Sequence, residues 1–292
     1  MCGICGELRF DGRSPDLGTL TRMTARLARR GPDHEGSYAD GPLAFGHRRL
    51  AIIDLSPHSN QPLIDQKLDL ALVFNGTIYN YPELREELRG LGYQFFSNGD
   101  TEVILKAYAA WGERCVDRLH GMFAFAVWDM EKRRLFLARD RLGIKPLFYH
   151  WDGATLVAAS ECKALFASGL VQARLCAQSV ANYFIYQFAI TPHTLFDGVY
   201  ELPPGHHLTL KPGGKPDILC YWDLDFPLDN GYESRDEAYW QDKLRLALDD
   251  AATSHTIGDV PIGSYLSGGI DSSVTTHLLI QNYPHPVQTF SI

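Results

Sequence analysis

The 292-residue sequence lacks any long apolar run: no stretch approaches the roughly 20 residues that a membrane-spanning helix needs. Its first ten residues, MCGICGELRF, lack the charged start, apolar stretch and cleavage site of a secretory signal. No basic stretch is interleaved with aromatic residues, and the cluster His47-Arg48-Arg49 is too short to follow a phosphate backbone. These absences argue against a membrane protein, a secreted protein and a partner made of nucleic acid.

The composition is that of a globular protein. Hydrophobic residues make up 45% and charged residues 21%, with a net charge of -8. The six cysteines are scattered, which is typical of a reducing compartment, so we expect a cytoplasmic protein. No internal repeat is visible, the length suits one large or two ordinary domains, and a homo-oligomer is compatible with the sequence.

Short apolar runs and helical patterns alternate from residue 1 to about 225. Helical spacing of apolar residues predicts one helix from Leu17 to Leu27, stopped by Gly31-Pro32, and a second after Asp100-Thr101-Glu102. The expected strands outnumber the helices and are Ile4–Phe10, Leu43–Leu55, Leu70–Phe74, Met122–Trp128, Arg134–Ala138, Leu147–Trp151 and Leu156–Ala159. This order favours antiparallel sheets with helices outside, an α+β domain over residues 1–225.

A second domain is expected after a polar, turn-rich linker at residues 226–234. Residues 235–292 begin with a helix at Glu237–Ala252. A strand at Val260–Leu266, a glycine loop, a helix at Ser272–Asn282 and a strand from Val287 follow. This order is the opening of a parallel α/β sheet. Two strands and one helix cannot cover such a sheet, so we expect the truncated start of a domain.

Cys2 follows the initiator methionine, and a small residue there favours removal of Met1. The thiol and a free α-amino group would then lie on one residue, with unperturbed pKa values of roughly 8.5 and 7.7–8. The amine can take the proton of the thiol, which activates a nucleophile without histidine. Two alternatives are an ordinary apolar residue and a redox pair with Cys5; the second is disfavoured because the motif leads straight into a strand.

Four further residues suit attack on an amide. Asn75 and the Gly76 N–H can donate to an oxyanion, although Asn-Gly is also a common turn. Arg49 can hold a carboxylate, or be a solvated surface residue. Asp100 can pair with an ammonium group, or cap the helix that follows it.

The glycine loop Ser267–Ser273, SGGIDSS, comes between a strand and a helix. Glycines let the backbone approach an anion, and the helix N-terminus offers free N–H groups. The spacing is not that of the Walker loop, and its lysine is missing. A capped helix after a glycine turn is the simpler alternative.

Across its whole length the chain resembles the glutamine-hydrolysing asparagine synthetases, which are class II glutamine amidotransferases with an N-terminal-nucleophile (Ntn) fold. The matching stretches are MCGICG, RRGPDHEG, GHRRLAIIDLS, QPL, FNGTIYNY, GDTEVILKAY, LHGMFAFAVWD, ARDRLGIKPLFY, SECKAL, LPPGH, YW and DVPIGSYLSGGIDSS. The resemblance implies an αββα sandwich of two antiparallel sheets between helical layers. It also implies that the start of an adenine-nucleotide (PP-loop) domain follows.

The resemblance also implies residue roles. Cys2 would be the nucleophile, and Asn75 with Gly76 the oxyanion hole. Arg49 would bind the α-carboxylate of glutamine and Asp100 its α-ammonium group. The rest of the pocket would come from Leu50, Ile52 and Ile53. Thr77 stands where the family usually has Glu, which leaves Asp100 with more of the task. This difference should weaken glutamine binding or shift specificity, without abolishing hydrolysis.

For the second domain, the resemblance implies a site for ATP with Mg²⁺. Its residues would be Leu266, Ser267, Gly268, Gly269, Asp271, Ser272, Ser273 and Ile292. The full-length reaction would convert glutamine, aspartate and ATP to asparagine, glutamate, AMP and pyrophosphate, with ammonia passing between the sites. We expect the chain as given to be competent only for glutamine hydrolysis.

Two other functions stay open. MCGICGELRFDG, NGTIYNYPELR and WGERCVDRLHGMFAFA resemble a branch that amidates an N-acetylated glutaminylglutamine dipeptide instead of aspartate. A non-catalytic scaffold or assembly subunit is the second alternative, against which the intact set of glutaminase residues argues.

Overall fold

The computed structural model describes residues 1–226 and 235–291. It divides into two compact units, one of residues 1–51 and 55–223 and one of residues 52–54 and 224–292. The expected linker at 226–234 falls, except for Phe226, outside the described residues. No helix of the described part is both long and apolar enough to cross a membrane.

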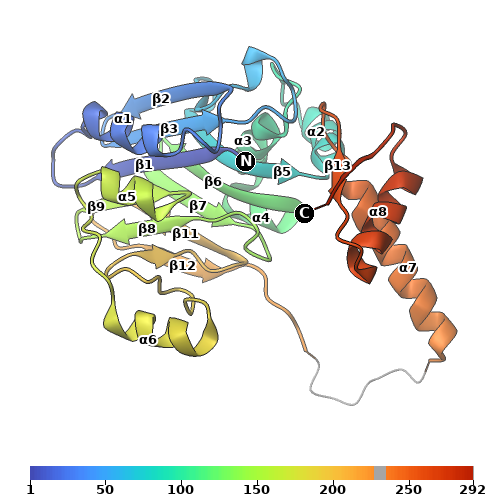
Figure 1. Cartoon of the computed structure of the whole chain (residues 1–292). Coiled ribbons are helices and arrows are strands. Elements are labelled where there is room, and N and C mark those ends of the chain that lie inside the picture. Colours follow the sequence, from blue (N-terminus) through green and yellow to red (C-terminus); the bar gives the residue numbers. More distant parts are fainter. Residues whose placement is uncertain (227–234, 292) are drawn as a thin grey trace. The chain divides into compact units, whose positions relative to one another are not determined.

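Two antiparallel sheets form the centre of the first unit (Figure 1). The strand order of the first sheet is β10-β8-β9-β1-β3-β2 and that of the second is β12-β11-β7-β6-β5-β4. The strands of the first sheet are β1 (Gly3–Arg9), β2 (His34–Asp40), β3 (Leu43–Arg49), β8 (Phe148–Trp151), β9 (Thr155–Ala159) and β10 (Tyr200–Glu201). Those of the second are β4 (Leu63–Asp65), β5 (Leu70–Ile78), β6 (Gly121–Asp129), β7 (Arg134–Arg139), β11 (His206–Leu210) and β12 (Asp217–Cys220).

Helices cover the outer faces of both sheets. Apolar residues of α1 and α5 pack on the first sheet, and those of α2, α3 and α4 on the second. The helices are α1 (Leu17–Arg26), α2 (Tyr81–Gly90), α3 (Asp100–Trp111), α4 (Cys115–Arg118), α5 (Cys162–Ala167) and α6 (Ala177–Tyr186), with short 3₁₀ turns at Pro57–Ser59 and Gly112–Arg114. The resulting layers are helix, sheet, sheet and helix, so the expected αββα sandwich is confirmed.

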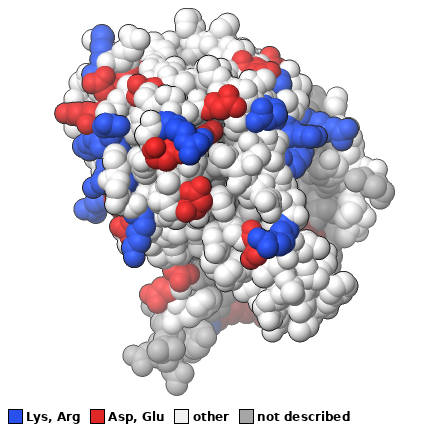
Figure 2. Space-filling model, turned by 90° about the vertical axis from the view of Figure 1, so that its left-hand side faces the viewer, with Lys and Arg blue, Asp and Glu red and all other residues white. Residues whose placement is uncertain are grey.

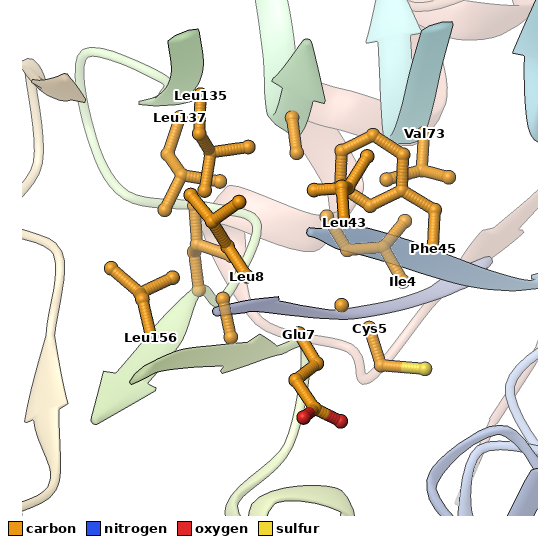
Figure 3. A pocket seen from close by; sticks show the side chains of 14 residues that line it. Ile4, Cys5, Glu7, Leu8, Leu43, Phe45, Val73, Leu135, Leu137 and Leu156 are labelled. Atoms are coloured by element: carbon orange, nitrogen blue, oxygen red, sulfur yellow. The ribbon is translucent and has the colours of Figure 1, made fainter. Parts of the chain in front are cut away.

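The central strands are apolar on both faces because each face is covered. On β5, Leu72 and Phe74 face the helices, whereas Ala71 and Val73 face the other sheet. Figure 3 shows the pocket between the sheets, where Ile4, Leu8 and Phe45 meet side chains of the facing sheet. Cys5 and Glu7 project from the opposite face of β1. The side chains that point into this pocket are apolar, which is typical of core packing and not of a polar ligand site.

One strand is shorter than expected. The sequence predicts a strand over Leu43–Leu55, but β3 ends at Arg49. The chain leaves the sheet because the next backbone groups take other partners. The N–H of Leu50 lies 3.3 Å from the Cys2 Sγ atom, and the N–H of Ala51 donates to Asp33 at 2.8 Å.

The second unit contains one parallel βαβ arrangement. Strands β13 (Gly263–Tyr265) and β14 (Gln288–Phe290) pair in parallel, and α8 (Ile270–Asn282) connects them. Helix α7 (Glu237–Ser254) precedes them and is capped by Asp236, which accepts the Tyr239 N–H at 2.9 Å. The expected α/β opening is confirmed.

Candidate active site

The Cys2 thiol lies where β1 begins and β3 ends. Gly3 pairs with Arg48 across these antiparallel strands. The Cys2 Sγ atom is 3.3 Å from the Leu50 nitrogen and 3.5 Å from the Leu50 oxygen. Burial raises the pKa of the thiol, while the Leu50 N–H and the nearby N-terminal amine lower it. The thiol therefore needs a proton acceptor before it can attack.

Cys5 has different surroundings. Its thiol is buried 3.4 Å from the Thr24 hydroxyl and 3.7 Å from the Gly46 oxygen, and burial raises its pKa to about 12. Cys2 and Cys5 are both free thiols. Nothing in these contacts pairs the two sulfurs as a redox couple.

Asn75 and Gly76 lie within β5, so the alternative of an Asn-Gly turn is wrong. Asn75 is 1% exposed, and neither its amide nitrogen nor its amide oxygen has a hydrogen-bond partner among the described residues. A buried amide that makes no bond costs roughly 1–3 kcal/mol. The Asn75 amide is thus a donor without a partner among the described residues, at a buried position where this is energetically unfavourable.

The Gly76 N–H points to the same side of β5 as its neighbours two residues away. The Phe74 N–H donates to the Gln61 side chain at 2.6 Å, and the Ile78 N–H to the Asp100 carboxylate at 3.0 Å. Strand β4 has ended by this point, and no side chain of the described residues accepts the N–H of Gly76. A side chain at position 76 would meet the Met122 carbonyl at 2.2 Å, so glycine is required here.

Asn75, Arg49 and Cys2 belong to one end of the layer between the sheets. On β5, Asn75 continues the inner-facing series Ala71 and Val73, and on β3, Arg49 continues the series of Phe45. Cys2 has the same relation to Ile4 on β1. The charges of Arg49 and Asp100 both act on the pKa of the Cys2 thiol, downward and upward respectively.

Arg49 is not a solvated surface residue. It is 5% exposed, and its Nη1 donates to the Ser56 oxygen at 2.8 Å and to Asn60 Oδ1 at 2.7 Å. These bonds hold the guanidinium group in one place. They also tie it to the turn that follows β3.

Asp100 is fully buried and is the first residue of α3, after the cap position at Gly99. Burial raises the pKa of Asp100 to about 7, although the N–H groups of Ile78 and Thr101 and the charge of Arg85 lower it. Because Gly99 occupies the cap position, the alternative that Asp100 is the helix N-cap is wrong. Its carboxylate contacts β5 beside Gly76 instead.

The remaining predicted pocket residues divide into two groups. Leu50 contacts Cys2 as described, and Thr77 is buried on the inner face of β5. Ile52 and Ile53 belong to residues 52–54, which group with the second unit. Their part in the glutamine pocket stays a prediction.

Four residues around the site were missed by the sequence reasoning. His47 is fully buried between the sheets, Gln61 holds β5, Arg30 donates to the Cys2 oxygen at 2.8 Å, and Lys145 lies beside Met1. A signal was present for His47, since a histidine interrupts the apolar strand LAFGH. The others stand in loops, where no periodicity marks burial.

In the second unit, the glycine loop forms a turn before α8. Gly268 has a φ of +82°, which favours glycine, and the Ser267 hydroxyl lies 3.0 Å from that of Ser272. Ser273 donates to the Gly269 oxygen at 2.8 Å. Leu266 bonds β14 through its N–H, and Asp271 is exposed in the first turn of α8. Ile292 lies outside the described residues.

Comparisons with known proteins agree with this architecture. A model described as a glutamine amidotransferase domain matches residues 1–222, and one described as asparagine synthase matches residues 243–292. An asparagine synthetase (glutamine-hydrolyzing) of Bacillus subtilis is 38% identical over all of this chain and 48% of its own length. An amidase named chry2 from Gibberella zeae is 35% identical over 96% of this chain and 44% of its own.

The fold also occurs in a solved structure of a Bacillus subtilis enzyme, a glutamine phosphoribosylpyrophosphate amidotransferase complexed with ADP and GMP. The TM-score is 0.56 at 17% identity, over 99% of this chain and 65% of that one. The chain spans about half the length of the curated relatives described above. Since the amidotransferase model covers 222 of the 292 residues, the chain belongs to the glutamine amidotransferase family.

Proposed function

We propose that residues 1–225 hydrolyse glutamine to glutamate and ammonia, with Cys2 as the nucleophile after Met1 is removed. The observation that carries this proposal is the buried, unpartnered amide of Asn75 beside the Gly76 N–H. Two donors that bond no side chain of the described residues suit an oxyanion that exists only during the reaction. The Cys2 thiol lies at the same end of the sheets.

The reaction follows from these groups. The α-amine of Cys2 takes the thiol proton, and the thiolate attacks the side-chain carbonyl carbon of glutamine. The oxyanion accepts hydrogen bonds from Asn75 and Gly76. The α-ammonium group then protonates the departing nitrogen, ammonia leaves, and water hydrolyses the glutamyl thioester to glutamate.

Arg49 and Asp100 would hold the ends of the substrate that do not react. The guanidinium group of Arg49 would bind the α-carboxylate, and Asp100 the α-ammonium group. Thr77 has no carboxylate, so the acidic group proposed for this pocket is that of Asp100, the first residue of α3. Its pKa of about 7 means that a bound ammonium group would be needed to keep it ionised below neutral pH.

In a longer protein, the ammonia would go to a carboxylate activated by ATP, aspartate being converted to asparagine. The similarity of residues 243–292 to asparagine synthase supports this part of the proposal, as does the turn Ser267–Ser273 before α8. Mg²⁺ would enter with ATP as part of the substrate. Acidic and basic side chains are interspersed on the face seen in Figure 2.

Glutamate release without ATP tests the proposal. The full chain, with loss of Met1 verified by mass, should release glutamate from glutamine, and Cys2→Ala should abolish this release. Cys220→Ala is the matched control, because it removes an exposed thiol whose hydrogen bond goes to the Trp222 oxygen. Hydrolysis that survives Cys2→Ala would refute the role of Cys2.

A further inference from the structure

Lys145 is held rigidly in the loop between β7 and β8. The carboxylate of Asp140 accepts the N–H groups of Ile144 and Lys145, both at 2.9 Å, and Arg139 donates to the Gly143 oxygen at 2.7 Å and the Lys145 oxygen at 2.9 Å. Arg139 also pairs with Glu201 at 2.8 Å. The side chains of Asp140 and Arg139 thus hold the backbone of this loop from Gly143 to Lys145.

The ammonium group of Lys145 is buried without a strong partner. Lys145 is 5% exposed, its Nζ lies 3.2 Å from the Met1 sulfur, and no carboxylate of the described residues is within 4 Å of it. A thioether is a weak acceptor. Burial lowers the pKa of Lys145, and the Arg30 charge lowers it further, while Asp140 and Cys2 raise it.

Arg30 approaches the N-terminus as a second cation. Its Nε donates to the Cys2 oxygen at 2.8 Å, and its Nη1 pairs with Glu161 at 3.0 Å. Glu161 also pairs with Lys163 at 2.6 Å, so its charge is shared. Asp33 is the carboxylate whose charge acts on the terminal amine, and it accepts the Ala51 N–H at 2.8 Å.

We propose that Lys145 and Arg30 keep the α-amine of Cys2, exposed when Met1 is removed, as the free base at neutral pH. An ordinary α-amine, with a pKa of roughly 7.7–8, would be mostly protonated at pH 7 and could not take the thiol proton. Two fixed cations disfavour the protonated form. This inference rests on the proposed function of Cys2.

The charges of Arg30 and Lys145 act in this direction on the amine of Met1. Burial is the largest cause and lowers the pKa of the Met1 amine. The charge of Cys2 comes next and raises this pKa, the charges of Arg30 and Lys145 lower it, and Asp33 raises it least. Removal of Met1 takes away the sulfur next to the Lys145 ammonium group and leaves the new amine one residue nearer the bond from Arg30. The charges of Arg49 and Asp100 act on the pKa of the thiol. Neither Lys145 nor Arg30 needs to touch the substrate for this role.

The test is an NMR titration of the α-amine in the 292-residue chain labelled with ¹⁵N-cysteine. The amine should titrate below its ordinary range, and Lys145→Met should raise its pKa, whereas Lys145→Arg should not. With Lys145→Met, glutamate release at pH 6.5 should fall about tenfold relative to release at pH 8.5. Lys132→Met is the control, since Lys132 pairs with Asp129 on the β6–β7 turn.

An amine that titrates in or above the ordinary range in the unmodified chain would overturn the inference, even if Lys145→Met failed to fold. A loss of rate that is equal at every pH, with an unchanged titration, would assign Lys145 a structural role and overturn it as well. The titration needs no glutamine. A lowered amine pKa without glutamine hydrolysis would therefore contradict the proposed function alone.

Discussion

His47 joins the two sheets at the candidate site, with its Nε2 3.1 Å from the carbonyl oxygen of Phe74. Burial lowers the pKa of His47 to about 3, so the ring is neutral and Nε2 carries the proton that the carbonyl accepts. Phe74 immediately precedes Asn75. The bond therefore links the sheet that carries Cys2 to β5, the strand that carries the oxyanion donors, and fixes the position of β5 relative to that sheet.

We expect His47→Phe to slow glutamine hydrolysis and to lower the free energy of unfolding by about 1–3 kcal/mol, because it leaves the buried Phe74 carbonyl without a donor. His47→Gln can place an amide N–H near the same carbonyl and should retain more of both. Steady-state rates and chemical denaturation of the three chains measure this. Equal rates in all three would show that the bond has no influence on the site.

Asn75→Ala should separate activity from stability. Loss of one oxyanion donor typically lowers kcat by about 10²–10³. The unfolding temperature should stay the same or rise, since the variant removes two buried polar atoms that have no hydrogen-bond partner in the described part of the chain. Ala124→Ser, on the strand opposite, controls for disturbance of the β5–β6 pair. If Asn75→Ala unfolded the chain while its kcat in the folded fraction was unchanged, Asn75 would be a structural residue.

Glutamine binding should weaken in acid because of Asp100. Burial raises the pKa of Asp100 to about 7, and an α-ammonium group binds the ionised form. KM should therefore rise up to about tenfold per pH unit below 7, and Asp100→Asn should have a high KM without this dependence. A KM of the unmodified chain that is constant from pH 5.5 to 8 would contradict this role.

The same shift has a consequence for stability. The folded-state pKa of Asp100 lies above the unfolded value of about 3.9, so its contribution to stability is complete below pH 4 and is lost as the pH rises through 7. The unfolding temperature of Asp100→Asn should accordingly fall less between pH 5 and 8 than that of the unmodified chain.

The interior strands except β11, HHLTL, could be predicted from sequence because both of their faces are buried. Runs such as Leu70–Phe74 are continuously apolar, and β5 only extends that run to Ile78. Strand β2, HEGSYAD, was missed because it is an edge strand whose residues alternate between half-buried and exposed. Strand β12 was missed for the same reason.

The site divides in a similar way. Cys2, Asn75 and Asp100 are residue types with an evident chemical use, so the sequence alone could suggest them. Whether Gly99 or Asp100 is the N-cap depends on the position of the helix start to within one residue, which the sequence pattern does not determine. Lys145 depended on a loop whose position is set by Asp140, and no local pattern encodes such a contact.

Labelling by a glutamine-derived electrophile, such as a diazoketone analogue, tests the central claim most directly. Peptide mapping of the full chain without Met1 should find one label on Cys2, formed more slowly when glutamine is present. The buried Cys5 and the exposed Cys220 should stay free, although Cys220 is the more accessible thiol. A label on Cys5 or Cys220 instead of Cys2, or labelling of Cys2 that glutamine does not slow, would contradict the assignment of Cys2 as the glutaminase nucleophile.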